Sequence, residues 1–296
     1  MARRYLIDKI LPARQVHLIG GPSGIGKTRW IVHLLKDWLE GKPVLGFKSH
    51  PEKMMYFATD RNEESLEETF QALDIGTLFP WKSLLNTTQS IDEIIKSHPD
   101  VKLFVFDPIM LFVPDYKYID YGTVATFLRN LTKLCVKYDV TIIGVVHTAK
   151  MKEGALFVNP RERLLGSAAW GAYAETLFIL GSNDFEHPEK SKIRNVNVLP
   201  RNSAEFVIHW KFNSHGIPTP CNAPAPSYEE SPSFTIFLSH IPENADLTTK
   251  ELEKIATDLS ISRATFFRHL KKAVEQLDLA VVTTGIYRKF IAPIEC

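Results

Sequence analysis

The sequence predicts an α/β protein in which a mainly parallel sheet lies between helices, followed by a small second domain. Three observations support this. Continuously apolar runs alternate with helical patterns over the first two-thirds of the 296 residues, which is typical of parallel sheets covered on both faces. A proline-rich stretch at 214–233 indicates a linker. A helix–turn–helix pattern follows it. We therefore expect domains at 1–213 and 234–296.

The first predicted strand, residues 16–19, runs into a glycine-rich loop. In such loops backbone N–H groups surround a phosphate, the lysine reaches the β- and γ-phosphates, and the threonine hydroxyl binds Mg²⁺. A helical pattern follows directly, which favours a nucleoside triphosphate site over a chance glycine turn. The loop fits the pattern Gly, any four residues, Gly-Lys-Thr, and consists of Gly21, Pro22, Ser23, Gly24, Ile25, Gly26, Lys27 and Thr28.

The remaining elements of the first domain alternate in the same way. The helix after the loop is expected to end near Gly41. Because ligands of such sheets bind at the carboxyl ends of the strands, the polar residues there are the next candidates. Further helices are expected at 63–73, 90–97 and 124–135, and strands at 54–59, 102–107, 140–146, 176–180, 193–198 and 206–211.

Asp107 ends the strand 102–107 after four apolar residues. This is the form of a Walker B strand, whose aspartate holds Mg²⁺, usually through water, so Thr28 and Asp107 are the predicted metal site. A turn aspartate before Pro108 is the alternative. Since Pro108 follows directly, no glutamate stands beside Asp107, which disfavours enzymes that carry their catalytic base there.

The base that activates water is then expected at the end of another strand. Asp60 follows the strand 54–59 and would lie next to the phosphate loop, so we expect it to orient the attacking water. Glu63 and Glu64 are close competitors. Capping of the following helix is the alternative role for Asp60.

Two polar residues, His147 and Thr148, end the strand 140–146, where a side chain can face a γ-phosphate. The segment 150–167 that follows is long and basic, and it contains glycine and proline. A loop of this length is functional or disordered, so contact with a nucleic-acid backbone and a solvated loop both remain open. Its candidate contact residues are Lys150, Lys152, Arg161 and Arg163.

Composition excludes few classes of protein. The net charge of +1 means that nucleic-acid binding would depend on local basic patches. Cys135, Cys221 and Cys296 are too widely spaced to suggest disulfides or a metal site, so a reducing cytoplasm is the simplest expectation. No apolar run approaches the ~20 residues of a membrane span. The N-terminus has no apolar core typical of a signal peptide.

The residues after the linker predict three helices and a hairpin. The first helix is expected at 234–241, and a capping box of Thr248 and Glu251 opens the second. The third begins at Arg263, and strands at 279–283 and 287–291 form the hairpin. On the third helix, inward positions are expected to be Ala264, Phe267 and Leu270.

The third helix carries a cluster of basic residues. We expect it to meet DNA through Arg263, Arg268 and Lys271, with protein contact as the alternative. Its outward residues are expected to be Arg263, Thr265, Phe266, Arg268, Lys271 and Lys272.

Taken together, these motifs resemble the RecA-type ATPases. Within that class the chain looks most like the RepA-like branch of hexameric replicative helicases and their phage and plasmid relatives, over about residues 1–213. The last part resembles winged-helix domains that read Ser-x-x-Thr-x-x-Arg-x-Leu. The resemblance rests on the phosphate loop, the strand ends Tyr-Phe-Ala-Thr-Asp, Phe-Val-Phe-Asp-Pro and His-Thr-Ala-Lys, and the segment Gly166-Ser167-Ala-Ala-Trp.

The resemblance implies a RecA-like fold that binds ATP and Mg²⁺, with Lys27, Asp60 and Asp107 in catalytic positions. His147 would sense the γ-phosphate. Relatives commonly carry glutamate where this chain has Asp60, which is one methylene shorter. The segment 150–167 would match a loop facing a channel that holds single-stranded DNA. Arg201 resembles the arginine finger that a neighbouring subunit supplies, although Leu199 stands where many relatives have lysine.

Two functions follow as expectations. The first is an ATP-driven DNA motor or helicase/loader that works as a homo-oligomeric ring, with a hexamer favoured, in a bacterial host cell if phage or plasmid encoded. The second is an ATP-controlled DNA-binding regulator, or a recombination or replication accessory protein, without unwinding activity. A small-molecule kinase is weaker, because it leaves the predicted winged helix unexplained. No membrane partner is expected.

Overall fold

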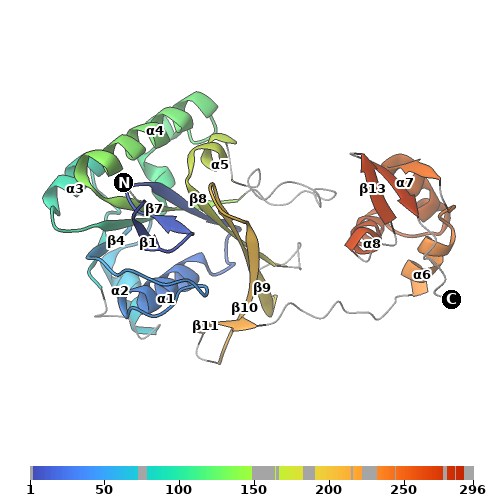
Figure 1. The fold of residues 1–296 in the computed structure, drawn as a ribbon, viewed down its shortest axis with the longest axis horizontal. Coiled ribbons are helices and arrows are strands. Elements are labelled where there is room, and N and C mark those ends of the chain that lie inside the picture. The colour runs from blue at the N-terminus through green and yellow to red at the C-terminus, as the bar shows by residue number, and fades with distance from the viewer. Residues whose placement is uncertain are drawn as a thin grey trace. The chain divides into compact units, whose positions relative to one another are not determined.

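The computed structural model divides the chain into two compact units. The first holds the elements up to β11, and the second holds those from α6 onward (Figure 1). The residues that the structure describes are 3–72, 79–148, 164, 167–182, 191–214, 216–221, 232–243, 245–275, 279–283 and 285–289.

A nine-stranded sheet organises the first unit, with the order β11-β10-β9-β8-β3-β7-β6-β4-β5. Six consecutive strands of this order, β8, β3, β7, β6, β4 and β5, run parallel to one another. The strands β9, β10 and β11 extend the sheet beyond β8, each antiparallel to the one before it. The predicted α/β fold with a mainly parallel sheet is therefore confirmed. The strands are β3 (Val16–Gly21), β4 (Met54–Ala58), β5 (Trp81–Ser83), β6 (Leu103–Asp107), β7 (Thr141–His147), β8 (Thr176–Ser182), β9 (Ile193–Pro200), β10 (Phe206–Phe212) and β11 (Pro218–Cys221).

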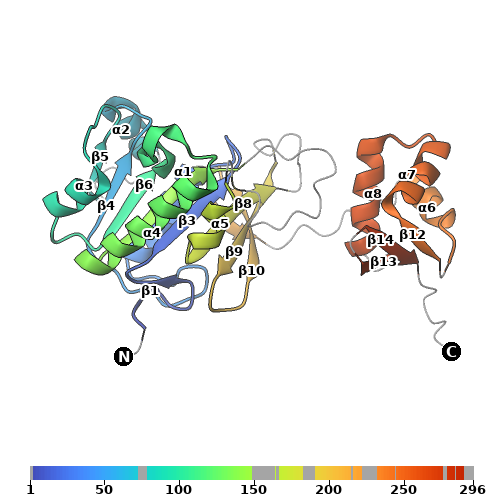
Figure 2. The same ribbon diagram turned by 90° about the horizontal axis from the view of Figure 1, so that it is seen from above.

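Helices cover both faces of this sheet (Figures 1 and 2). One face packs on α1 (Lys27–Leu39) and α2 (Glu63–Ala72), the other on α3 (Ile91–Ser97), α4 (Tyr121–Tyr138) and α5 (Ala169–Tyr173). Successive side chains of a strand point to opposite faces, so each buried strand contributes side chains to the hydrophobic core on both faces of the sheet. The predicted two-sided cover is thus confirmed.

Several short elements complete the first unit. The strands β1 (Tyr5–Ile7) and β2 (Leu11–Pro12) form a separate two-stranded sheet. The 3-10 helices η1 (Ile109–Phe112) and η2 (Pro114–Tyr116) follow β6. Gly144 on β7 allows η1 to approach closely, because a Cβ there would lie 2.6 Å from Ile109.

One part of the predicted linker is wrong. Residues 218–221 form β11, which pairs with β10 from Phe212–Pro218 to His209–Cys221. Prolines at 218 and 220 misled the prediction because proline is excluded from central strands, whereas β11 is the edge strand of the sheet, where proline is tolerated.

The second unit combines three helices with a three-stranded antiparallel sheet of order β12-β14-β13 (Figure 2). The predicted capping box is present, since Thr248 accepts from the Glu251 N–H and the Glu251 carboxylate accepts from the Thr248 N–H at 2.8 Å. The elements are α6 (Pro232–Ser239), β12 (Asp246–Thr248), α7 (Thr249–Asp258), α8 (Arg263–Glu275), β13 (Leu279–Thr283) and β14 (Ile286–Lys289).

The buried face of α8 differs from the prediction. Phe266, expected to face outward, is fully buried, with its ring 5.9 Å from that of Phe237. Phe267, expected to be inward, is only partly buried. Lys272 was also expected to face outward, but its ammonium lies 4.1 Å from the ring centre of Phe234. Two adjacent phenylalanines made the phase of the helix ambiguous by one residue.

Candidate nucleotide site

The glycine-rich loop ends β3 and begins α1 in a form suited to an anion. Gly24 and Gly26 have left-handed backbones, with φ of 77° and 96°. Gly26 is the N-cap of α1, and no side chain caps this helix and no acidic residue stands in its first turn. The amino ends of α3, α4 and α7, in contrast, receive side-chain caps from Ser90, Asp120 and Thr248. The donor set of the loop therefore fits a phosphate group.

Lys27 lies inside this loop. Its ammonium donates to the carbonyls of Gly21 at 2.9 Å and Pro22 at 3.0 Å, and to Nδ1 of His147 at 3.3 Å. Burial lowers the pKa of Lys27 to about 8, against the opposing attraction of Asp107 and Asp60. The structure therefore brings the loop lysine within hydrogen-bond distance of His147, which was predicted for the same site.

Two hydroxyl groups meet one carboxylate oxygen at the end of β6. Thr28 donates from Oγ1 to Oδ2 of Asp107 at 2.8 Å, and the hydroxyl of Tyr56 donates to the same oxygen at 2.5 Å. The pKa of Tyr56 is raised well above its ordinary value, mainly by burial and next by the negative charge of Asp107. The hydroxyl therefore keeps its proton. The pair predicted to hold Mg²⁺ thus lies within hydrogen-bond distance.

The site also contains Tyr56, a residue for which no role in it was predicted. Its place on β4 explains the contact, because Ala58 pairs with Asp107 in the parallel register and Tyr56 lies two residues earlier on the same strand. Side chains two apart on a strand share a face. Without the strand order, however, nothing in the sequence indicates that β4 lies beside β6.

His147 lies at the carboxyl end of β7, between β3 and β6 in the sheet. It pairs with Gly21 in the β3–β7 register, and the Thr148 N–H donates to the Gly21 carbonyl at 3.2 Å. Burial, followed by the charge of Lys27, lowers the pKa of His147. The neutral imidazole then accepts from Lys27 through Nδ1.

Asp60 follows β4, and its side chain is half exposed. Burial, followed by Asp107, raises its pKa. The capping alternative does not hold, because Asn62 caps α2 by accepting from the Ser65 N–H at 3.0 Å. Asp60 is therefore free of that structural role and influences Lys27 and His147 electrostatically.

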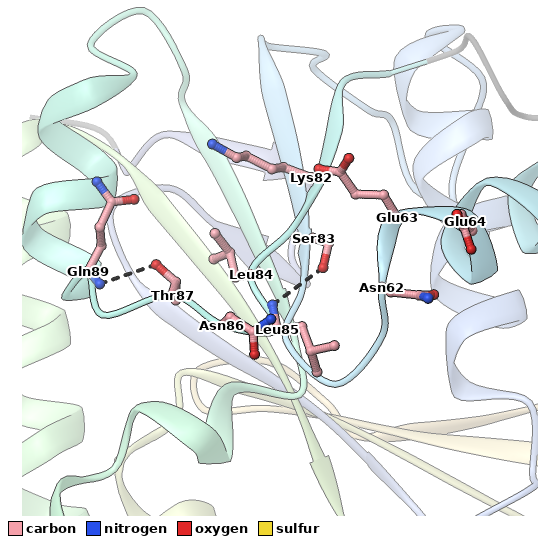
Figure 3. A pocket seen from close by; sticks show the side chains of 10 residues that line it. All are labelled: Asn62, Glu63, Glu64, Lys82, Ser83, Leu84, Leu85, Asn86, Thr87 and Gln89. Carbon is pink, nitrogen blue, oxygen red and sulfur yellow. Dashed lines mark hydrogen bonds between the residues drawn. The ribbon is translucent and has the colours of Figure 1, made fainter.

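The two competing glutamates line a different pocket, of about 550 Å³, between the first turn of α2 and the chain after β5. Figure 3 shows Glu63 and Glu64 around it with Asn62 and Lys82. Of the residues predicted for the nucleotide site, only these two glutamates line this pocket.

Arg201 lies beside the amino ends of the parallel strands, whereas the phosphate loop lies at their carboxyl ends. Pro200 pairs with Thr176 at the amino end of β8, and Arg201 follows directly. Its guanidinium donates to the carbonyl of Ala172, and to that of Ala174 at 3.4 Å, at the end of α5. Within one chain the structure does not bring Arg201 to Lys27. The predicted contact residues Lys150, Lys152, Arg161 and Arg163 lie outside the described residues.

The basic residues of α8 belong to the second unit. Arg263 and Arg268 are exposed and Lys271 is partly buried. Arg263 pairs with Glu253 through its Nε at 2.8 Å, and Arg268 donates to Thr265 at 3.0 Å. Both arginines thus remain accessible, although each has a partner on its own unit.

The model of the AAA domain family matches residues 1–153, more than half of the chain, and covers the loop, Asp60, Asp107 and His147. The chain belongs to the AAA domain family. No curated protein matches it.

Among solved structures, this AAA domain protein is similar to one described as an ATPase domain, with a TM-score of 0.53 and 13% identity over 71% of this chain and 85% of that one. The similarity shows a shared α/β fold, consistent with the expected RecA-like core. In the described part of the chain no helix has both the length and the hydropathy of a membrane span.

Proposed function

We propose that this protein is an ATP-driven DNA motor or helicase/loader of the replicative-helicase type, which hydrolyses ATP in a ring of subunits. One observation carries the proposal: at the carboxyl ends of β3, β6 and β7, Lys27 hydrogen-bonds to His147 and the adjacent Thr28 hydrogen-bonds to Asp107. This is where α/β sheets bind ligands, and the chain shares its fold with a domain described as an ATPase.

In this proposal the loop residues Gly21 to Thr28 hold the triphosphate, and Lys27 exchanges its carbonyl partners for phosphate oxygens. The Thr28 hydroxyl donates its hydrogen bond to Asp107, which leaves the lone pairs of the Thr28 oxygen available to a cation. Bound Mg²⁺ would neutralise negative charge on the phosphates during transfer.

Asp60 is the proposed general base. Its raised pKa follows from burial beside Asp107, and a carboxylate of higher pKa is a better proton acceptor. His147 is the proposed sensor, because its contact with Lys27 would change when Lys27 meets a phosphate. The following segment, with Lys150, Lys152, Arg161 and Arg163, would carry that change to single-stranded DNA.

Arg201 is proposed to act between subunits, on the site of a neighbouring copy. Arg201 follows β9 beside the amino end of β8, whereas Lys27 follows the carboxyl end of β3, and this placement favours action in trans over action in its own chain. For the second unit we propose a winged helix that meets DNA through Arg263, Arg268 and Lys271. The element order α6, β12, α7, α8, β13, β14 and the exposed arginines of α8 support this proposal.

The proposal is tested by steady-state ATP hydrolysis with and without single-stranded DNA. We expect DNA to stimulate hydrolysis and Lys27→Ala to abolish it. Lys133→Ala, at an exposed lysine of α4, is the matched control and should behave like the wild type. A hydrolysis rate indifferent to DNA would contradict the motor.

The second candidate function is an ATP-controlled DNA-binding regulator. The separate basic helix α8 favours it, since a helix of this kind can read duplex DNA without a motor. A footprint at one duplex sequence, together with no unwinding of forked DNA, would support this function instead.

A further inference from the structure

We propose that Tyr56 is a positioning residue that orients the Asp107 carboxylate for the divalent cation. This inference rests on the proposed function and gives Tyr56, the first residue of the strand end Tyr-Phe-Ala-Thr-Asp, a role that the sequence did not suggest. The hydroxyl of Tyr56 and the hydroxyl of Thr28 both donate to Oδ2 of Asp107, at 2.5 and 2.8 Å. Two donors from different elements, β4 and α1, fix the rotation of one carboxylate.

The arrangement separates the two carboxylate oxygens. Within the described part of the chain, Oδ1 of Asp107 accepts no hydrogen bond, while Oδ2 accepts two. Oδ1 is therefore the oxygen presented to a hydrated cation. Carboxylates that support metals are commonly oriented by such outer hydrogen bonds, and loss of one costs about 10- to 100-fold in metal affinity or activity.

The tyrosine itself is held rigidly. It is 1% exposed, and its ring packs edge-on against Phe70 of α2 at 5.4 Å and lies 6.2 Å from Phe79. Phe70 in turn packs on Trp81 of β5 at 5.6 Å. Because these aromatic rings enclose the Tyr56 ring, its hydroxyl has a fixed position at Asp107.

The packing alone does not require the hydroxyl. A phenylalanine would fill the same aromatic cluster, and an apolar site disfavours a polar group unless it has a partner. Asp107 is the partner here. We therefore infer that the hydroxyl of Tyr56 orients the Asp107 carboxylate, whereas its ring contributes to the packing of the core.

The test is Tyr56→Phe, with Tyr138→Phe as the matched control. Tyr138 makes the same kind of bond, to Asp92 at 2.8 Å, but between α4 and α3 on the other face of the sheet. Binding of a fluorescent ATP analogue would be titrated with Mg²⁺, followed by hydrolysis over the same Mg²⁺ range. Thermal melting would verify that both variants are folded.

For Tyr56→Phe we expect the half-saturating Mg²⁺ concentration to rise about tenfold, with metal-free binding of the analogue unchanged. Tyr138→Phe should match the wild type in both. A folded Tyr56→Phe protein with wild-type Mg²⁺ dependence would overturn the inference, and so would a weakened metal-free binding. If the wild type itself shows no Mg²⁺-dependent hydrolysis, the proposed function fails instead.

Discussion

At Gly26 the backbone conformation and a close neighbour act together. The residue has φ of 96°, and a Cβ there would lie 2.7 Å from the ring of Phe212 on β10. Phe212 and Trp210 of β10 thus pack against the phosphate loop from the antiparallel part of the sheet.

We predict that Gly26→Ala destabilises the protein more than Gly41→Ala. Gly41 also has a positive φ, of 69°, but a Cβ there would meet nothing within 4 Å. Gly41→Ala should therefore cost only the backbone term, about 1 kcal/mol. Gly26→Ala adds displacement of Phe212 and should also weaken nucleotide binding. Urea denaturation and analogue binding measure both, and equal losses at the two positions would refute the steric role of Phe212.

His17 is buried away from the nucleotide loop, at the amino end of β3. Its Nε2 lies 2.9 Å from the Pro12 carbonyl, and its Nδ1 has no hydrogen-bond partner among the described residues. Burial lowers the pKa of His17 to about 4 from 6.5. The unfolded chain therefore takes up a proton at a pH where the folded chain does not.

This linkage predicts a loss of stability in weak acid. The contribution of neutral His17 to the free energy of unfolding is complete above pH 6.5 and is lost as the pH falls towards 4. At pH 5 the loss is about 2 kcal/mol. Urea denaturation at pH 7.5 and 5 should show that His17→Gln loses less stability than the wild type between the two conditions. Equal losses in both proteins would argue against it.

Among the elements, the long and strongly patterned ones followed from sequence. The strands β3, β6 and β7 and the helices α1 and α4 were predicted because buried parallel strands are apolar throughout and the helices carry a clear apolar stripe. The short strands β1, β2, β5 and β12 were missed. They have only two or three residues, which is too few for a period to appear.

Part of the candidate site could be predicted from the sequence. The loop pattern indicates Lys27, and because strand ends in a parallel sheet meet on one side of it, Asp107 and His147 were expected beside Lys27. Tyr56 was not, because its role depends on which strand lies beside β6. Phe266 was assigned to the wrong face because the neighbouring Phe267 fits the apolar stripe equally well, and only packing against Phe237 decides between them.

The helix α8 carries the prediction for DNA binding. Arg268→Ala should weaken binding of duplex DNA and lower the slope of log affinity against log salt by about 1, since one phosphate contact is lost. Lys254→Ala, at an exposed lysine of α7, is the control and should leave the slope unchanged. If both variants bind with the wild-type slope, α8 does not contact phosphate.

For the whole molecule, the position of Arg201 leads to a prediction about assembly. Arg201→Ala and Lys27→Ala chains should each be inactive alone, because in the proposed ring each lacks one half of the site that two subunits share. Mixed before assembly, they should recover part of the hydrolysis rate, since some interfaces then pair an intact Lys27 with a neighbour's intact Arg201.

The control is a chain that carries both substitutions, which should rescue neither single variant. Because Arg201 also holds the end of α5, melting curves must show that Arg201→Ala is folded. Full activity of Arg201→Ala alone would remove the basis for action in trans.

Strand separation on a forked duplex tests most directly whether ATP hydrolysis drives movement on single-stranded DNA, as we propose. We predict that the wild type separates the strands only with ATP and Mg²⁺, and that Lys27→Ala does not while Lys133→Ala does. A wild type that hydrolyses ATP in the presence of the fork but never separates its strands would contradict the claim.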